Sequence, residues 1–187
     1  MHQVAVFIDG GYLDHTILSQ FQGQKVNYYA LSKAVVDSTG SGKDILRIYY
    51  YHCLPYQSSP PTTEESQRFS QMQRFFRALQ RTARIEVKQG RIAFRGVDAK
   101  GEPIFEQKRI DLLLGLDLAL LAVKKIITQA FVIAGDSDLI PAITAAKAEG
   151  VTIYLVHGSS CHDDLLDEAD ERIPITTSLI NSALRMI

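Results

Sequence analysis

Phe131-Val-Ile-Ala-Gly-Asp-Ser-Asp-Leu-Ile-Pro141 is the stretch that decides the fold. It begins with four apolar residues, a run too short for a whole helix, which predicts a buried strand. Gly135 allows a sharp turn, and Asp136 and Asp138 then precede a new apolar segment, as residues at a helix N-cap do. Two carboxylates therefore lie at the carboxyl end of a strand, where open α/β sheets bind ligands. One aspartate would be enough for a cap, so the pair points to a bound cation.

The rest of the chain alternates in the same way. A second buried strand, 4–8, ends in Asp9 and two glycines that allow a tight turn. Further strands are predicted at 45–54, 151–156 and, at an edge, 173–175; helices are predicted at 12–21, 27–36, 62–81, 109–125, 139–149, 161–168 and 177–186. Residues 84–88 and 91–95 alternate around Gln89-Gly90 and predict a hairpin, followed by a polar loop at 96–103. This order predicts one α/β domain over 1–187, with a central, mainly parallel sheet flanked by helices.

Composition excludes several classes of protein. The chain has 187 residues and a formal net charge of -1, so no overall basic charge indicates nucleic acid. Cys53 and Cys161 lie far apart and favour ordinary thiols rather than a disulfide framework or a zinc site. We expect no secretory signal, because the N-terminus runs straight into a strand-like segment, and the longest apolar run, 112–123, is too short to cross a bilayer. We expect a cytoplasmic protein with no membrane partner; the sequence leaves open whether it forms a homo-oligomer.

Asp117 is unusual because it interrupts that apolar run, which we interpret as a buried packing helix. A buried carboxylate without a partner would cost several kcal/mol, so a partner is expected. Lys108, Arg109, Lys124 or a metal ion could provide it. On one helix, Asp111 and Asp117 would lie about 120° and roughly 9 Å apart, too far to grip the same ion directly.

The aspartates are more informative together than alone. Each by itself would usually be a cap or a surface charge. Asp9, Asp111, Asp136 and Asp138, without histidine or cysteine ligands, suit a hard cation such as Mg²⁺ or Mn²⁺ if they share a pocket. Such ions serve phosphodiester chemistry by activating water and stabilising the attacking and leaving oxygens.

These motifs resemble a known family, the NYN domains of the LabA/DUF88 type. The resemblance rests on Phe7-Ile8-Asp9-Gly10, Lys108-x-x-Asp111 with Asp117, Gly135-Asp136-Ser137-Asp138 with Pro141, and Ala169-Asp170. It covers nearly the whole chain, and the order and spacing of the motifs make it fairly specific. NYN domains are similar to PIN domains, which have a Rossmann-like three-layer α/β fold and, in several members, metal-dependent ribonuclease activity.

By this resemblance the chain would be a metal-dependent ribonuclease, and we expect single-stranded RNA as its substrate and Mg²⁺ or Mn²⁺ as its cofactor. Asp9, Asp111, Asp136 and Asp138 would be the catalytic acids, and Asp117 would also be a metal-site position. Many relatives carry asparagine three residues after the first aspartate, where this chain has Tyr12. The same resemblance therefore keeps a second reading open, a non-catalytic RNA-binding or regulatory module.

A substrate surface is predicted from charge. Residues 64–109 contain 11 Lys and Arg against 6 Asp and Glu, whereas residues 110–171 contain 3 against 11. A basic rim beside an acidic metal pocket suits RNA, although a solvated helix face would show the same pattern. The predicted substrate contacts are Tyr12, Ser137, Lys108, Arg74, Arg77 and Arg81, of which Ser137 could instead cap its helix. The tyrosines at 49–51 favour core packing over base stacking.

Two further enzyme classes fit less well. A Toprim-type site also uses Asp-x-Asp after a strand, but it pairs this motif with a glutamate on an early strand, where this chain has Asp9. A phosphatase with an aspartyl nucleophile would need a second acid two residues after Asp9.

Overall fold

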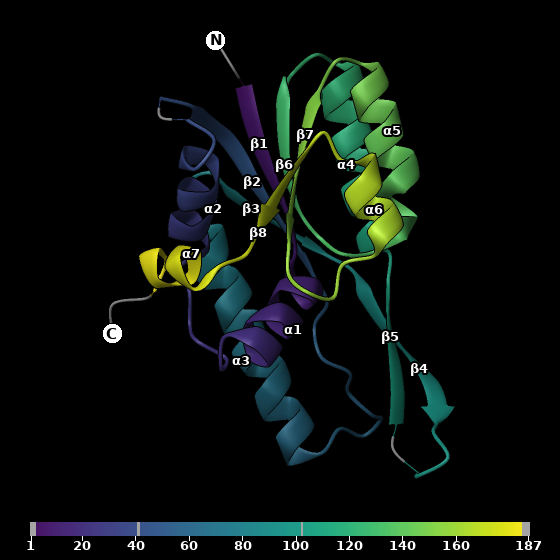
Figure 1. The fold of residues 1–187 in the computed structure, drawn as a ribbon. Helices are drawn as coiled ribbons and strands as arrows, with labels where there is room; N and C mark the ends of the chain where they lie inside the picture. The colour runs from purple at the N-terminus through teal and green to yellow at the C-terminus, as the bar shows by residue number, and fades with distance from the viewer. Residues whose placement is uncertain (1–2, 41, 102, 185–187) are drawn as a thin grey trace.

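The computed structural model describes residues 3–40, 42–101 and 103–184. Six strands form one sheet in the order β3-β2-β1-β6-β7-β8, and every neighbouring pair is parallel (Figure 1). These strands are β1 (Gln3–Asp9), β2 (Asp44–His52), β3 (Ile85–Gln89), β6 (Gln129–Ile133), β7 (Thr152–His157) and β8 (Glu171–Pro174). The expected mainly parallel α/β sheet is confirmed.

Helices cover both faces of this sheet and make it the middle of three layers (Figure 1). On one face lie α1 (Gly10–Gln20), α2 (Tyr28–Asp37), α3 (Thr63–Gln80) and α7 (Thr177–Ser182). On the other lie α4 (Ile110–Val123), α5 (Ile140–Ala148) and α6 (Asp163–Glu168), with the short 3₁₀ helix η1 (Ser137–Leu139) before α5. Predicted residues of the last helix from 185 onward lie outside the described residues.

Side-chain alternation along the strands explains the two cores. In β1, Val4, Val6 and Ile8 point toward α1, α2 and α3, while Ala5 and Phe7 point toward α4 and α5, and all five are fully buried. A strand buried on both faces reads as a continuous apolar run, which is why β1 and β6 are conspicuous in the sequence. None of the helices in the described residues is long and apolar enough to cross a membrane.

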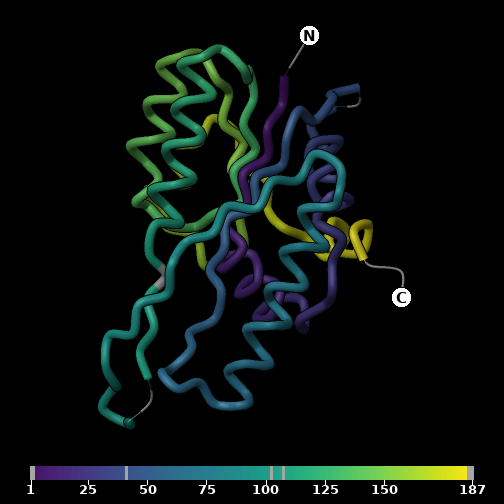
Figure 2. Tube along the Cα trace, turned by 180° about the vertical axis from the view of Figure 1, so that it is seen from behind, coloured from purple at the N-terminus to yellow at the C-terminus, as the bar shows by residue number. Residues whose placement is uncertain are grey.

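The predicted hairpin around Gln89-Gly90 is wrong. β3 is a strand of the main sheet and pairs with β2. The Gly90 N–H donates to the His52 carbonyl at 3.0 Å, so Gly90 still follows β2 and the chain makes no hairpin turn at this point. The hairpin is instead formed by the next two strands, β4 (Arg91–Val97) and β5 (Pro103–Lys108), which pair antiparallel. Its turn lies within the stretch 96–103 that was predicted to be a polar loop. This β4–β5 ribbon extends away from the three layers in both views (Figures 1 and 2).

The prediction that α4 is a buried packing helix is also wrong in part. Its inner side is buried through Ile110, Leu114, Leu118 and Ala122. Four other large side chains are half or more exposed: Leu112 at 63%, Leu116 at 50%, Leu120 at 50% and Val123 at 60%. The helix is therefore apolar both toward the sheet and toward solvent.

Candidate functional site

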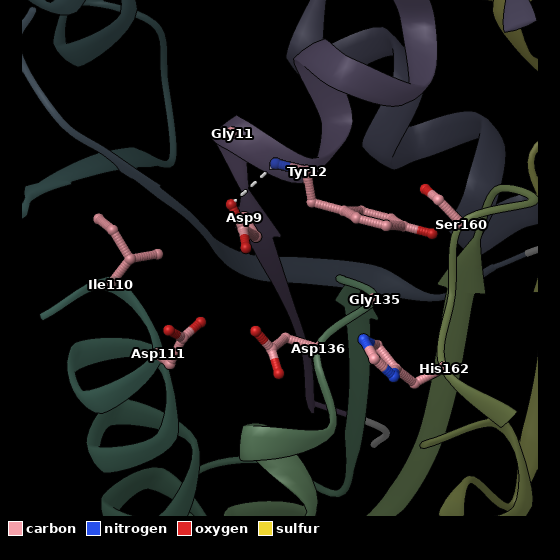
Figure 3. Close-up of a pocket in the computed structure, with 9 residues that line it drawn as sticks. All are labelled: Asp9, Gly11, Tyr12, Ile110, Asp111, Gly135, Asp136, Ser160 and His162. Atoms are coloured by element: carbon pink, nitrogen blue, oxygen red, sulfur yellow. Dashed lines mark hydrogen bonds between the residues drawn. The ribbon is translucent and has the colours of Figure 1, made fainter. Parts of the chain in front are cut away.

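The carboxyl edge of the sheet holds an acidic pocket of about 330 Å³. β1 ends there at Asp9, β6 leads into Gly135 and Asp136, and the first turn of α4 brings Asp111 from the side. The full lining is Asp9, Gly11, Tyr12, Ile110, Asp111, Gly135, Asp136, Ser160 and His162 (Figure 3). Three of the four predicted catalytic acids thus line one cavity.

Asp9 is the most perturbed of these acids. Its carboxylate caps α1 by accepting a hydrogen bond from the Tyr12 N–H at 3.0 Å. Burial raises the pKa of Asp9 to about 6; the Tyr12 hydrogen bond opposes this rise, and the charge of Asp111 adds to it. A cation in the pocket would favour the ionised form of the carboxylate.

Asp111 and Asp136 point toward one another across the pocket, with Asp9 near both (Figure 3). Burial raises the pKa of Asp111, and the charges of Asp136 and Asp138 raise it further. Asp136 is exposed and caps η1, accepting the Asp138 N–H at 3.0 Å. Burial and the neighbouring negative charges both oppose ionisation of Asp9 and Asp111, and a bound cation would offset this cost.

Two predicted residues lie beside the pocket rather than in its lining. Asp138 borders an adjoining groove between α4 and α5, which Asp111 and Lys108 also line. Ser137 is half-buried in η1 and is absent from the lining of either cavity.

Tyr12 forms one wall of the pocket. Its ring lies against Gly135 so closely that a Cβ there would come 2.2 Å from Tyr12 Cε2. Its hydroxyl accepts a hydrogen bond from the Gly158 N–H at 2.9 Å, and burial raises its pKa. Tyr12 therefore joins the turns that follow three adjacent strands, β1, β6 and β7.

Ser160 and His162 were not predicted as site residues. Both are exposed in the loop after β7, and the His162 N–H donates to the Gly135 carbonyl at 3.0 Å. A signal for them exists in the sequence, because this loop follows the strand expected next to the Asp136 strand. The rule that placed Asp9 and Asp136 at the carboxyl edge applies equally to that loop.

Asp117 is not brought to the pocket. Its carboxylate accepts a hydrogen bond from the buried Tyr51 hydroxyl at 2.9 Å, and Lys88 Nζ lies 3.7 Å away. The expectation that Asp117 needs a partner is confirmed, but none of the partners we predicted is the one found. Lys88 belongs to β3, which we had predicted to form a hairpin, so its position beside Asp117 was not expected.

The predicted arginine rim is not beside the pocket either. Arg74, Arg77 and Arg81 are exposed on or just after α3, which covers the face of the sheet opposite α4. Arg81 leads into the amino end of β3, where Arg84 forms an ion pair with Asp44 at the start of β2. Arg81 therefore lies toward the amino edge of the sheet, and no lysine or arginine of the described chain lines the acidic pocket.

The donor set suits a hard cation, with carboxylate oxygens from three elements. In the part of the chain that the structure describes, no three His, Cys, Asp or Glu side chains converge closely enough to form a ready-made metal cage. Mg²⁺ usually keeps several waters and uses one or two carboxylates, which is the coordination that these acids could supply.

Fold and pocket together define an α/β protein with three layers and an acidic site at the carboxyl edge of a parallel sheet. The chain belongs to the NYN domain family, whose model matches residues 3–176. NYN domains are a PIN-like nuclease family, and PIN-like nuclease domains typically use divalent metal ions. No curated protein matches the chain. Its assignment to the LabA/DUF88 type stays a prediction.

Proposed function

We propose that this protein is a divalent-metal-dependent ribonuclease that hydrolyses single-stranded RNA. The observation that carries the proposal is the meeting of Asp9, Asp111 and Asp136 in one pocket, from three separate elements. Family membership supports nuclease chemistry in general. The two free cysteines, Cys53 and Cys161, suit a reducing compartment such as the cytoplasm.

Mg²⁺ or Mn²⁺ is the cofactor that this pocket suits best. A bound ion would lower the pKa of a water and stabilise charge on the phosphate oxygens. Asp9 and Asp136 would hold the ion, and Asp111 would accept a hydrogen bond from the attacking water and orient it. Asp138, which lines the adjoining groove together with Asp111, would add negative charge that favours the cation.

The β4–β5 ribbon offers a better RNA surface than α3 does. Phe94 and Phe105 are 49% and 46% exposed, and they form a cluster with Tyr56, with ring centroids 5.1–6.0 Å apart. Aromatic side chains of this kind stack with the bases of single-stranded nucleic acid. Arg91 at the start of β4 and Arg109 just after β5 add positive charge where the ribbon joins α4.

A second candidate is a non-catalytic RNA-binding or regulatory module. The feature that favours it is Tyr12, which takes the place of an asparagine found in many relatives and whose hydroxyl is already bonded to Gly158. In this reading the acids would serve to bind a cation or to shape the fold, and the ribbon would still bind RNA.

The deciding experiment is cleavage of end-labelled single-stranded RNA in Mn²⁺ and in Mg²⁺. Wild type is compared with Asp136→Asn, which keeps the size of the side chain and its ability to cap η1. Asp167→Asn is the matched control, because Asp167 is exposed on α6 and pairs only with Arg172 in the described residues. We expect cleavage by wild type and the control, and a loss of at least about a hundredfold in Asp136→Asn.

Circular dichroism must show that Asp136→Asn is folded. Equal cleavage by Asp136→Asn and wild type would contradict the proposed role of the pocket. A folded wild type that binds RNA and leaves it intact in both metals would support the regulatory module instead.

A further inference from the structure

An exposed apolar ridge runs along α4. We define the α4 ridge as Leu112, Leu116, Leu120 and Val123, which follow one another at helical spacing and are each 50–63% exposed. A soluble protein leaves single apolar residues in contact with water at little cost, but a contiguous apolar patch usually marks an interaction site. The nuclease chemistry proposed above has no use for this ridge.

A trough of small residues lies directly beside the ridge. We define the trough as Gly115 and Ala119 of α4 with Ala142 and Ala145 of α5. α4 and α5 approach closely here, since a Cβ on Gly115 would come 3.1 Å from the Ala142 Cβ. The trough belongs to a groove of about 770 Å³, which Leu112 and Leu116 of the ridge also line.

We propose that a second copy of this chain covers the α4 face, so that the protein is a two-fold symmetric dimer. The ridge of each copy would pack into the trough of the other, with the two α4 helices antiparallel. Packing the ridge of one helix into the groove of another is the ordinary way in which helices associate. A two-fold interface must be self-complementary, and a ridge beside a trough on one face meets this condition.

The charges along the face favour a protein over RNA. Between Leu112 and Val123 the only ionisable residue is Asp117, which is turned toward Tyr51 and Lys88 on the flank of the helix. A strand of RNA needs cations along its path. The ridge offers none, whereas depletion of charge at the centre is typical of interfaces between proteins.

The ends of the face favour a second copy over an unrelated protein. Asp111 and Asp138 lie at the amino end of the groove, together with Glu106 and the two cations Lys108 and Arg109. The carboxyl end of α4 is followed by Lys124, which is exposed and forms no ion pair with the described residues. Antiparallel pairing brings Lys124 of each copy toward the amino end of the groove of the other, where three acids, Glu106, Asp111 and Asp138, outnumber the two cations.

This pairing also fixes a register. If the two-fold axis crosses the middle of the ridge, Leu116 of one copy lies opposite Leu120 of its partner. A helix of 14 residues is about 21 Å long, so the two acidic pockets would lie at opposite ends of the interface, separated by roughly that distance. The dimer would leave both pockets open and would turn them away from each other.

The test is the molar mass in solution, by sedimentation equilibrium across micromolar concentrations. We expect wild type to be a dimer and Leu116→Glu to dissociate, with dimerisation weakened by roughly thirtyfold or more, as at an interface hot spot. Leu18→Glu is the matched control, because Leu18 is 70% exposed on α1, on the other face of the sheet. This control should remain a dimer.

Mixing variants tests the register. Leu120→Lys alone should also be monomeric. An equimolar mixture of Leu116→Glu and Leu120→Lys should regain the dimer, because one glutamate then faces one lysine and the second pair of leucines is restored. A wild type that stays monomeric at high micromolar concentration would overturn the proposal, as would a dimer that Leu116→Glu does not weaken.

One further outcome would also overturn it. If wild type is monomeric and Leu116→Glu weakens RNA binding, the ridge is a nucleic-acid surface rather than a dimer interface. None of these measurements depends on catalysis, so the dimer and the proposed nuclease activity can fail independently.

Discussion

The ring of Tyr12 and the backbone of Gly135 are in direct contact, and a side chain at position 135 would collide with the ring at 2.2 Å. Through this contact the first turn of α1 is braced against the turn that carries Asp136. The relative placement of Asp9 and Asp136 therefore depends on a residue pair that contains neither aspartate.

We predict that Gly135→Ala disturbs the pocket while the rest of the fold survives. The added methyl group cannot be accommodated without movement of the Tyr12 ring, and overpacking of this kind costs about 1–3 kcal/mol. Urea unfolding should show this loss of stability. The rate of RNA cleavage should also fall, because the turn that carries Asp136 is displaced. Tyr12→Ala alone also costs stability, because it removes the ring and the acceptor of the Gly158 N–H. The double variant Tyr12→Ala/Gly135→Ala should therefore lose less stability than the sum of the two single losses, and strictly additive losses would contradict the proposed clash.

The raised pKa of Asp9 predicts a pH-dependent stability. An acid whose pKa is higher in the folded state than in the unfolded state binds more protons when folded, so folding is favoured at low pH. This contribution is present below the unfolded value near 3.8 and is lost as the pH rises through about 6. Asp9→Asn removes the titration, and it should be more stable than wild type at pH 7.5 by on the order of 3 kcal/mol.

Measurement of urea unfolding at pH 4 and pH 7.5 checks this difference. The two proteins should be nearly equal at pH 4, because Asp9 is then largely protonated in wild type. Asparagine can still accept the Tyr12 N–H, so the helix cap is kept. A wild type that is the more stable of the two at pH 7.5, in a buffer that contains a chelator, would contradict a pKa raised by burial.

Asp117 should matter for stability and not for the metal. Asp117→Ala removes the acceptor of the buried Tyr51 hydroxyl, and an unsatisfied buried group costs about 1–3 kcal/mol. The variant should nevertheless keep the rise in unfolding temperature that Mn²⁺ gives wild type. Asp136→Asn should show the opposite pattern: its stability without metal should be nearly that of wild type, and Mn²⁺ should not raise its unfolding temperature. If Mn²⁺ no longer raised the unfolding temperature of Asp117→Ala, Asp117 would have to contribute to metal binding, and the prediction would be wrong.

RNA binding should depend on the ribbon and not on the predicted arginine rim. Phe94→Ala should weaken binding of single-stranded RNA by about fivefold to a hundredfold, since base stacking contributes about 1–3 kcal/mol per base. Fluorescence anisotropy in EDTA measures this affinity without cleavage. Arg81→Ala, at the amino edge of the sheet, should bind as wild type does. Equal affinities of Phe94→Ala and wild type would exclude the ribbon as the RNA surface.

Much of the pocket could be predicted from local sequence. Asp9 and Asp136 each follow a buried apolar run, and parallel strands bring their carboxyl ends to one edge. Two short patterns therefore predict that both acids reach the same edge of the sheet, but the pairing of β1 with β6 is visible only in the structure. The capping box of Thr62 and Glu65 and the left-handed turn at Gly150 were predictable for the same local reason.

What could not be predicted depends on long-range pairing. β3 and β4 both alternate, and their spacing fits a hairpin as well as two separate sheets. Without the pairing of β3 to β2, Lys88 could not be placed beside Asp117. The exposed side of α4 was hidden for another reason: a helix that is apolar all round shows no periodicity, so the sequence could not indicate which side lacks a neighbour.

The β4–β5 ribbon pairs only with itself in the described residues and adds no strand to the main sheet. Apart from Ile92, which packs against the core on the α4 side, its length and its side chains can therefore change with little effect on the two cores. If the ribbon binds RNA as proposed, lengthening or replacing this one hairpin would change which RNA is bound while the acidic pocket stays intact. Grafting the ribbon of another family member onto this chain would then exchange specificity and leave the chemistry as it is.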